Sequence, residues 1–169
     1  MKKYTPLLLL LLFSCHKQPQ LPPATYTGTN IVACKVYGGI FSAQGVKSIY
    51  SDGFVTYSLF TNSVVYIEAV TSNPHLDITI YCIYTGLNIP VQLFLSPYPG
   101  SNGAEFDDFS NGTLPTAGNT FQTDSTHIGS ITFTYYDGKI LSGVFSFDAV
   151  NSAGVVKHIT EGRFDILKN

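Results

Sequence analysis

Three carboxylates lie close together in the chain, at Glu105, Asp107 and Asp108. Carboxylate oxygens are ligands that Ca²⁺ prefers, and the ion takes six to eight oxygens in all. The spacing matches no defined calcium loop, so the alternative is an acidic turn in contact with solvent. These residues are therefore a candidate calcium site, and the sequence predicts no other metal centre and no bound cofactor.

Motifs for zinc binding, nucleophilic catalysis and phosphate binding are missing from the sequence. The histidines His16, His75, His127 and His158 are scattered singly, without a Cys-x-x-Cys or His-Glu-x-x-His pairing. There is neither a Gly-x-Ser-x-Gly elbow nor a phosphate-binding glycine loop. A hydrolytic triad would require His158, Asp165 and a serine to meet in space, which their spacing does not predict. We therefore expect a protein without enzymatic activity.

The first 14 residues resemble a bacterial lipoprotein signal peptide. Lys2 and Lys3 precede an apolar run that is too short to span a bilayer core of ~30 Å. Leu12-Phe13-Ser14 then leads directly to Cys15. In signals of this kind the chain is cleaved before the cysteine, whose thiol carries a diacylglyceryl group. We expect lipidation of Cys15; the alternatives are a transmembrane anchor or an ordinary secretory cleavage beside an incidental cysteine.

The residues after Cys15 bear on the membrane and on the domain boundaries. His16 stands where an aspartate would resemble an inner-membrane retention signal, so we expect an outer-membrane lipoprotein. The acidic run that resembles a surface-export tag is missing, which leaves the face of the membrane open. The Pro-rich residues 16–29 predict an extended tether. The expected organisation is a signal peptide at 1–14, a lipidated cysteine and tether at 15–29, and one domain at 30–169.

The composition indicates an all-β domain. Nine Lys and Arg residues, of which Lys2 and Lys3 belong to the signal, stand against eleven Asp and Glu residues. A mildly acidic chain lacks the basic surface that nucleic-acid binding requires, so no nucleic-acid partner is expected. The 11 Tyr and 12 Phe residues, with many β-branched residues, favour strands over helices.

Alternation of apolar residues predicts nine or ten short strands. Residues 76–84 and 141–149 each place apolar side chains at every second position, and residues 130–136 place Ile131, Phe133 and Tyr135 on one face. Gly38-Gly39 and Asp137-Gly138 are hairpin signals, the second favouring a type I′ turn. The predicted fold is an antiparallel β-sandwich, with a small β-barrel as the alternative. Residues 97–129 interrupt the pattern as a long loop, and the alternative is that they contain one strand near residues 119–123.

Cys34 and Cys82 fall in predicted strands of a protein that we expect outside the cytoplasm. A disulfide would persist there, and the alternative is two buried thiols. Asp124-Ser125-Thr126 resembles a short O-glycosylation acceptor of Bacteroidetes, which makes Ser125 a candidate glycan site. Gly143, among large residues of its strand, indicates a bulge or a ring packed over the bare backbone.

Motifs near both ends of the mature chain resemble those of a protein family. They are Leu21-Pro22-Pro23-Ala24-Thr25 with Gly28 and Asn30, Cys34, Gly38-Gly39, Gly129-Ser130-Ile131-Thr132, Ser142-Gly143-Val144-Phe145-Ser146-Phe147 and Ile159-Thr160-Glu161-Gly162-Arg163-Phe164-Asp165. The family that they resemble is one of small uncharacterised lipoproteins from Bacteroidetes. The resemblance implies a cell-envelope address and a β fold, and no activity.

These observations favour a lipid-anchored, non-enzymatic binding or structural module of the cell envelope. Its expected partners are the membrane, through the lipid, and a glycan or an envelope protein. Tyr81, Tyr98 and Tyr136 fall on predicted outer faces or loops, where they would stack on a sugar or pair across strands. One alternative function is a hydrolase of envelope or other polymers with its site in the 97–129 loop, and another is a carrier of a small apolar ligand.

Overall fold

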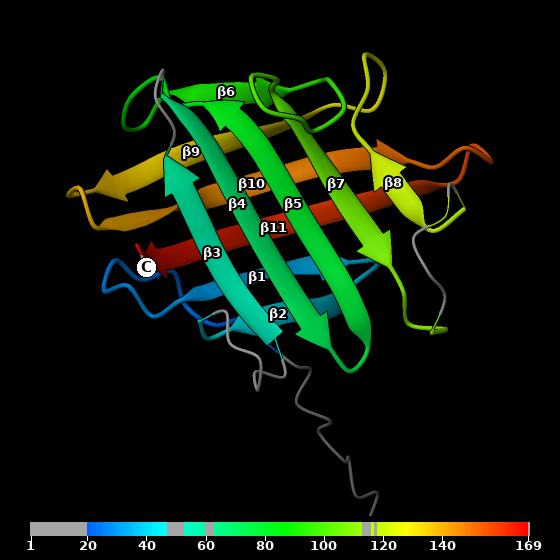
Figure 1. Cartoon of the computed structure of the whole chain (residues 1–169), viewed down its shortest axis with the longest axis horizontal. Helices are drawn as coiled ribbons and strands as arrows, with labels where there is room; N and C mark the ends of the chain where they lie inside the picture. Colours follow the sequence, from blue (N-terminus) through cyan, green and yellow to red (C-terminus); the bar gives the residue numbers. More distant parts are fainter. Residues whose placement is uncertain (1–19, 47–52, 60–62, 113–115, 117, 169) are drawn as a thin grey trace, which may run out of the picture.

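The computed structural model describes residues 20–46, 53–59, 63–112, 116 and 118–168, and their regular structure is β-strand throughout (Figure 1). No helix in this part of the chain is long and apolar enough to cross a membrane. The strands are β1 (Ile31–Val36), β2 (Gly39–Gln44), β3 (Gly53–Leu59), β4 (Val64–Ser72), β5 (His75–Ile83), β6 (Pro90–Leu93), β7 (Gly103–Asp108), β8 (Thr120–Gln122), β9 (Gly129–Tyr136), β10 (Ile140–Val150) and β11 (Val156–Leu167).

The strands form one antiparallel sheet that curves into a nearly closed barrel. The strand order is β2-β1-β11-β10-β8-β7-β5-β4-β3, with β9 beside β10 and β6 beside β9. In Figure 1, β3, β4, β5 and β7 cross in front of β1, β9, β10 and β11. The predicted all-β antiparallel class is confirmed. The continuous, strongly curved sheet corresponds to the barrel alternative more closely than to two separate layers.

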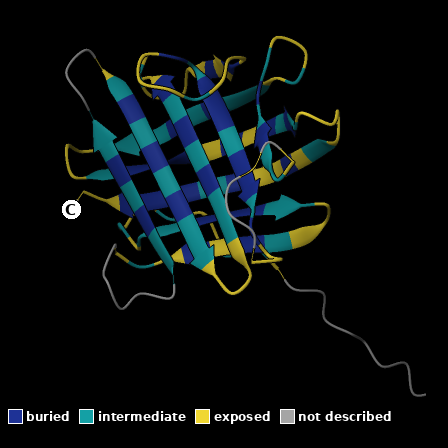
Figure 2. Ribbon diagram, turned by 45° about the vertical axis from the view of Figure 1, so that its right-hand side comes forward, coloured by how far each residue is buried: buried dark blue, intermediate teal, exposed yellow. Residues whose placement is uncertain are grey.

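The core lies between the two crossing halves of the sheet. On β5 the side chains of Ile78, Ile80 and Cys82 are fully buried, as the alternation of residues 76–84 predicts. On β10 the predicted inward residues Phe147 and Ala149 are also buried. Figure 2 shows buried positions alternating with less buried ones along the strands. A period of two therefore suffices to assign the inward face where the ladder is regular.

A bulge in β9 reverses the prediction for its last residues. Ser142 of β10 pairs with Tyr135, but Gly143 pairs with Phe133, so β9 carries one extra residue. The residues after the bulge change face, and Tyr136 rather than Tyr135 packs against the core. A Cβ at Gly143 would collide with the ring of Phe164, because that ring lies over the bare backbone. Both predicted explanations of Gly143 are thus confirmed.

Two hairpin turns differ in detail from the predictions. The first turn is formed by Tyr37 and Gly38, which have φ angles of 51° and 77°, and β2 begins at Gly39. Positive φ at both central residues is the mark of a type I′ turn, so the turn lies one residue earlier than predicted. In the turn between β9 and β10, Gly138 has a φ of 92° but Asp137 does not have a positive φ. That turn is therefore not type I′.

The region 97–129 contains two strands and is not one long loop. β8 occupies Thr120–Gln122, as expected, whereas β7 at Gly103–Asp108 was not predicted. β7 pairs with β5 on one side and with β8 on the other. Its inward residues Ala104 and Phe106 are buried. The strand was not predicted because its acidic residues made the alternation of apolar residues hard to recognise in the sequence.

The N-terminal segment before β1 is fastened to the barrel by one carboxylate. Asp165 on β11 is 1% exposed and accepts six hydrogen bonds. The donors are Thr25 Oγ1 (2.6 Å), Thr27 N (3.0 Å), Gly28 N (2.9 Å), Thr29 N (3.3 Å), Thr29 Oγ1 (3.1 Å) and Ser142 Oγ (2.9 Å). Residues 25–29 therefore lie against the barrel and are not part of a free tether.

A second contact continues this attachment toward the N-terminus. Arg163 Nη1 donates to the carbonyl oxygen of Pro22 at 2.9 Å. Asn30 Oδ1 accepts the main-chain N–H of Leu167 at 2.9 Å, and Gly28 lies against Leu167 and Ile140. The motifs near the two ends of the chain are thus brought together in space, which explains why both contain small and hydroxylated residues.

Replacing Asp165 should destabilise the protein in a pH-dependent way. Burial opposes ionisation of Asp165, but hydrogen bonds from Thr25, Gly28, Ser142 and Thr27 outweigh it and lower its pKa from 3.8 to about 2. This stabilisation is complete above the unfolded pKa and is lost as the pH falls from about 4 to about 2. We expect Asp165→Asn to reduce the free energy of unfolding at pH 7 by about 2 kcal/mol.

Urea unfolding at pH 7 and at pH 2.5 measures this effect. The matched control is Asp148→Asn, because Asp148 is an exposed carboxylate whose surface pairing with His158 should contribute less than about 1 kcal/mol. Equal free energies of unfolding for Asp165→Asn and the wild type at pH 7 would contradict the fastening role of this carboxylate.

Candidate binding groove

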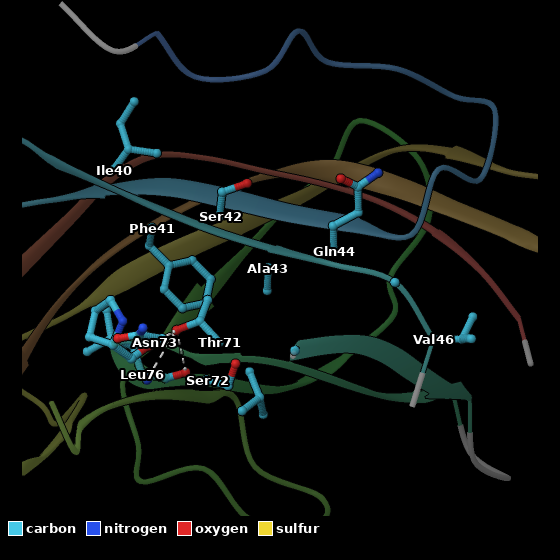
Figure 3. A pocket seen from close by; sticks show the side chains of 14 residues that line it. Ile40, Phe41, Ser42, Ala43, Gln44, Val46, Thr71, Ser72, Asn73 and Leu76 are labelled. Carbon is cyan, nitrogen blue, oxygen red and sulfur yellow. Dashed lines mark hydrogen bonds between the residues drawn. The ribbon is translucent and has the colours of Figure 1, made fainter. Parts of the chain in front are cut away.

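A groove of about 840 Å³ opens between β2 and the hairpin of β4 and β5 (Figure 3). It lies where the sheet remains open, since β2 and β3 are the two ends of the strand order. Beside the groove, Val55 N donates to the carbonyl oxygen of Gly45 at 3.0 Å and holds the two sheet ends together. Residues 40–46, 53, 70–74 and 76 line the groove.

The walls of the groove are built from well-packed elements. Phe41 and Ala43 on β2 are buried, and Figure 3 shows the Phe41 ring pointing from β2 toward Thr71 of the hairpin. Thr71 Oγ1 donates to the carbonyl oxygen of Pro74 at 2.6 Å and accepts the N–H of Leu76 at 3.2 Å. These two bonds fix the hairpin that overhangs β2, so the shape of the groove does not depend on a mobile side chain.

The groove is chemically neutral. Among the described residues that line it, none has a titratable side chain. The polar side chains are hydroxyls and carboxamides, and the apolar ones are aliphatic or aromatic. Such a lining offers hydrogen bonds and van der Waals contact without a charge, an acid, a base or a nucleophilic thiol. This arrangement can bind an uncharged ligand and has no group suited to proton transfer.

The three carboxylates of the calcium prediction are divided between two faces of β7. Glu105 and Asp107 face outward, whereas Asp108 lies on the face of Phe106 and pairs with Lys157 at 3.5 Å. Strand alternation separates them, since neighbouring residues point to opposite faces. In the described part of the chain, no group of three His, Cys, Asp or Glu side chains is arranged to hold a metal ion. The structure therefore does not bring these residues together as a calcium site.

The outward pair on β7 is electrostatically unusual. Burial raises the pKa of Glu105 and of Asp107, and each lies close enough to the other to hydrogen-bond. Asp107 is 8% exposed and lies opposite Asp77 of β5 in the ladder. For Glu105 the negative charge of Asp107 adds to the effect of burial, so a bound proton is favoured on this pair.

Cys34 and Cys82 are free, buried thiols, which is one of the two possibilities that the sequence left open, the other being a disulfide. Cys34 lies on β1 and Cys82 on β5, which belong to the two crossing halves of the sheet. Burial raises the pKa of each thiol to about 12. A thiol with so high a pKa is a core side chain, not a nucleophile. Cys15 lies outside the described residues.

The residues considered for hydrolysis serve other contacts. His158 Nδ1 lies 2.7 Å from Asp148 Oδ1 on the surface, while Asp165 is enclosed by the N-terminal segment. His158 and Asp165 are therefore not members of one triad. In the region 97–129, which the alternative function makes the site of a hydrolase, the buried hydroxyl of Ser101 donates to the carbonyl oxygen of Ser96 at 2.9 Å. This hydrogen bond stabilises a turn.

Ser125 lies in an exposed turn, as a modified residue would require. Asp124 Oδ1 accepts the N–H groups of Thr126 and His127 at 2.8 and 2.6 Å and shapes this turn. Glycosylation of Ser125 stays a prediction, which mass spectrometry of the native protein can decide.

The three tyrosines singled out in the sequence are dispersed. Tyr81 lies beside its cross-strand partner Tyr66, with ring centroids 4.7 Å apart, which is ordinary pairing on a sheet face. Tyr136 packs against the core, and Tyr98 is 55% exposed in a loop. They form no common stacking surface.

The groove itself was missed by sequence reasoning. Its residues come from β2, β3 and the β4–β5 hairpin, and their meeting depends on the strand order. One signal was present, since β2 contains no charged residue and no proline. Exposed edge strands commonly carry such residues to prevent pairing with other chains.

Comparisons with protein-family models, with curated proteins and with solved structures find no match to this chain. The resemblance to small lipoproteins of Bacteroidetes therefore stays a prediction. A function has to follow from the groove and from the residues that form it.

Neutralising Asp107 and neutralising Asp108 of β7 should change the Tm at pH 7 in opposite directions. The raised pKa of Asp107 means that its contribution to stability is greatest at low pH and is lost as the pH rises through the folded pKa. We expect Asp107→Asn to raise the Tm at pH 7 by roughly 2–4 °C, the shift produced by about 1 kcal/mol in a domain of this size.

Asp108→Asn is the matched contrast for this measurement. Burial opposes ionisation of Asp108, but hydrogen bonds from Ser110 and the charge of Lys157 outweigh it and lower its pKa. Asp108→Asn should therefore lower the Tm at pH 7. Calorimetry between pH 5 and pH 8 checks both variants, and a lower Tm for Asp107→Asn at pH 7 would be the opposite of what we expect.

Proposed function

We propose that this chain is a lipid-anchored, non-enzymatic binding module of the cell envelope that takes an uncharged ligand in the groove between β2 and the β4–β5 hairpin. The observation that carries the proposal is the neutral groove of about 840 Å³, a size within the range of ligand sites. Binding is favoured over hydrolysis because the described lining residues supply no acid or base that could activate a hydroxyl or a water molecule.

The proposed address comes from the signal-like segment that ends at Cys15. Arg163 bonds to the carbonyl oxygen of Pro22, and six residues, or seven Cα-to-Cα steps, separate Pro22 from the lipidated Cys15. A chain of that length reaches at most about 25 Å. The proposed module is therefore held near its membrane, and its ligand would belong to the envelope.

Substitution of Cys15 tests the address. We expect Cys15→Ala to abolish incorporation of radiolabelled palmitate and to move the protein from the membrane fraction of a bacterial host to a soluble or uncleaved form. Cys34→Ala is the matched control, because a buried thiol of the core should not affect acylation. Equal labelling of Cys15→Ala and the wild type would contradict a lipid anchor at this residue.

Filling the groove tests the binding site. The probes are a panel of neutral oligosaccharides and a phage library of random heptapeptides, each presented to the full chain in detergent micelles. We expect at least one probe class to bind the wild type and to bind Leu76→Trp at least tenfold more weakly, because Leu76 lines the groove and the larger indole would occupy it. Gln92→Trp is the control, since Gln92 is an exposed strand residue outside the groove. If neither class distinguishes the two variants, the proposed site is wrong.

A further inference from the structure

The edge of β2 presents main-chain hydrogen-bonding groups along the groove. Gly45 N donates to the carbonyl oxygen of Asn30 at 2.9 Å, which continues the register between β2 and β1. In an antiparallel pair, alternate residues bond to the neighbour while those between them point away. Phe41 and Ala43 therefore bond toward β1, and the N–H and C=O groups of Ile40, Ser42 and Gln44 face away from it.

This edge lacks the features that usually prevent the addition of another strand. Among the described residues, β2 pairs only with β1, and it carries neither a charged residue nor a proline. The edge strand β6 provides a contrast within the same sheet, because it has only four residues and begins with Pro90. Short length and proline are means by which edges are protected. The β2 edge is thus open to pairing while the β6 edge is protected.

The described residues that line the groove carry no charge, and this neutrality selects the occupant. A charged side chain entering the groove would lose hydration without meeting an opposite charge, which is unfavourable. The outward main-chain groups extend from Ile40 to Gln44, a distance of about 13 Å at strand spacing. A segment of four or five residues in extended conformation matches that length. Apolar side chains on one of its faces would meet Phe41 and Leu76.

We propose that the groove binds an uncharged, extended peptide segment of a partner protein, which adds to the sheet as a strand beside β2. This inference rests on the proposed function and names its ligand class. Main-chain hydrogen bonds to Ile40, Ser42 and Gln44 supply affinity, and the neutral walls supply selectivity. The added strand would lie between β2 and the overhanging β4–β5 hairpin.

The test uses heptapeptides selected from the random phage library on the full chain in detergent micelles. We expect the selected sequences to be depleted in Asp, Glu, Lys and Arg, and the tightest peptide, made synthetically, to bind by calorimetry. Ser42→Pro should weaken its binding at least tenfold, because proline removes the N–H that faces the added strand. Ser42→Thr keeps this N–H and should retain binding. Equal affinities of these two variants would overturn the inference.

Two measurements on the wild-type chain avoid any dependence on how Ser42→Pro folds. Two methylated peptides are compared, each N-methylated at every second amide. Methylation of the amides that face β2 should abolish binding, and methylation of the amides between them should leave it unchanged. Bound peptide should also slow hydrogen exchange at the amides of Ser42 and Gln44, without changing Ala43. A peptide that binds with no such alternation would overturn strand addition.

The outcomes separate this inference from the proposed function. If neutral oligosaccharides bind and lose affinity in Leu76→Trp while no peptide is selected, the groove is a binding site but strand addition is wrong. If neither class binds, the proposed function and the inference both fail.

Discussion

The ionised carboxylate of Asp165 joins the two ends of the folded chain. It is buried with no cationic side chain among its hydrogen-bond partners, and hydroxyl and main-chain N–H groups stabilise its charge instead. A buried charge is costly unless its oxygens are fully bonded, so the donors must all be present together. The N-terminal segment, β10 and β11 consequently form one cooperative unit. β1 follows this segment directly, and β2 in turn pairs only with β1 among the described strands.

The sequence predicted local features well where the backbone is regular. Alternation identified the inward faces of β5 and β10, because a pleated strand determines which side chains share a face. It failed at Tyr135, where the bulge opposite Gly143 adds a residue and shifts the register. It also failed for β7, because three of its six residues are acidic and resemble a loop in composition. The same residues suggested a calcium site, which the alternation of that strand divides.

Long-range features could not be predicted from the sequence, because they depend on which strands become neighbours. The motifs around Thr25 and Asp165 were recognised only as part of a family resemblance, since nothing local shows that a carboxylate near one end meets hydroxyls near the other. Likewise β2 and β3 are consecutive in sequence and occupy opposite ends of the strand order. The groove exists because the sheet curves until these ends approach without closing.

The strand order also separates the proposed anchor from the proposed ligand edge. A pull on the lipid would reach the barrel through Pro22 and Asp165, and so would act on β11. β1 lies between β11 and β2. The edge of β1 that is opposite to β2 is hydrogen-bonded to β11. The load would therefore be carried by the interior of the sheet, where both edges of a strand are paired. The free edge of β2 would remain unloaded, which is the condition under which a weakly held extra strand can pair with it near a membrane surface.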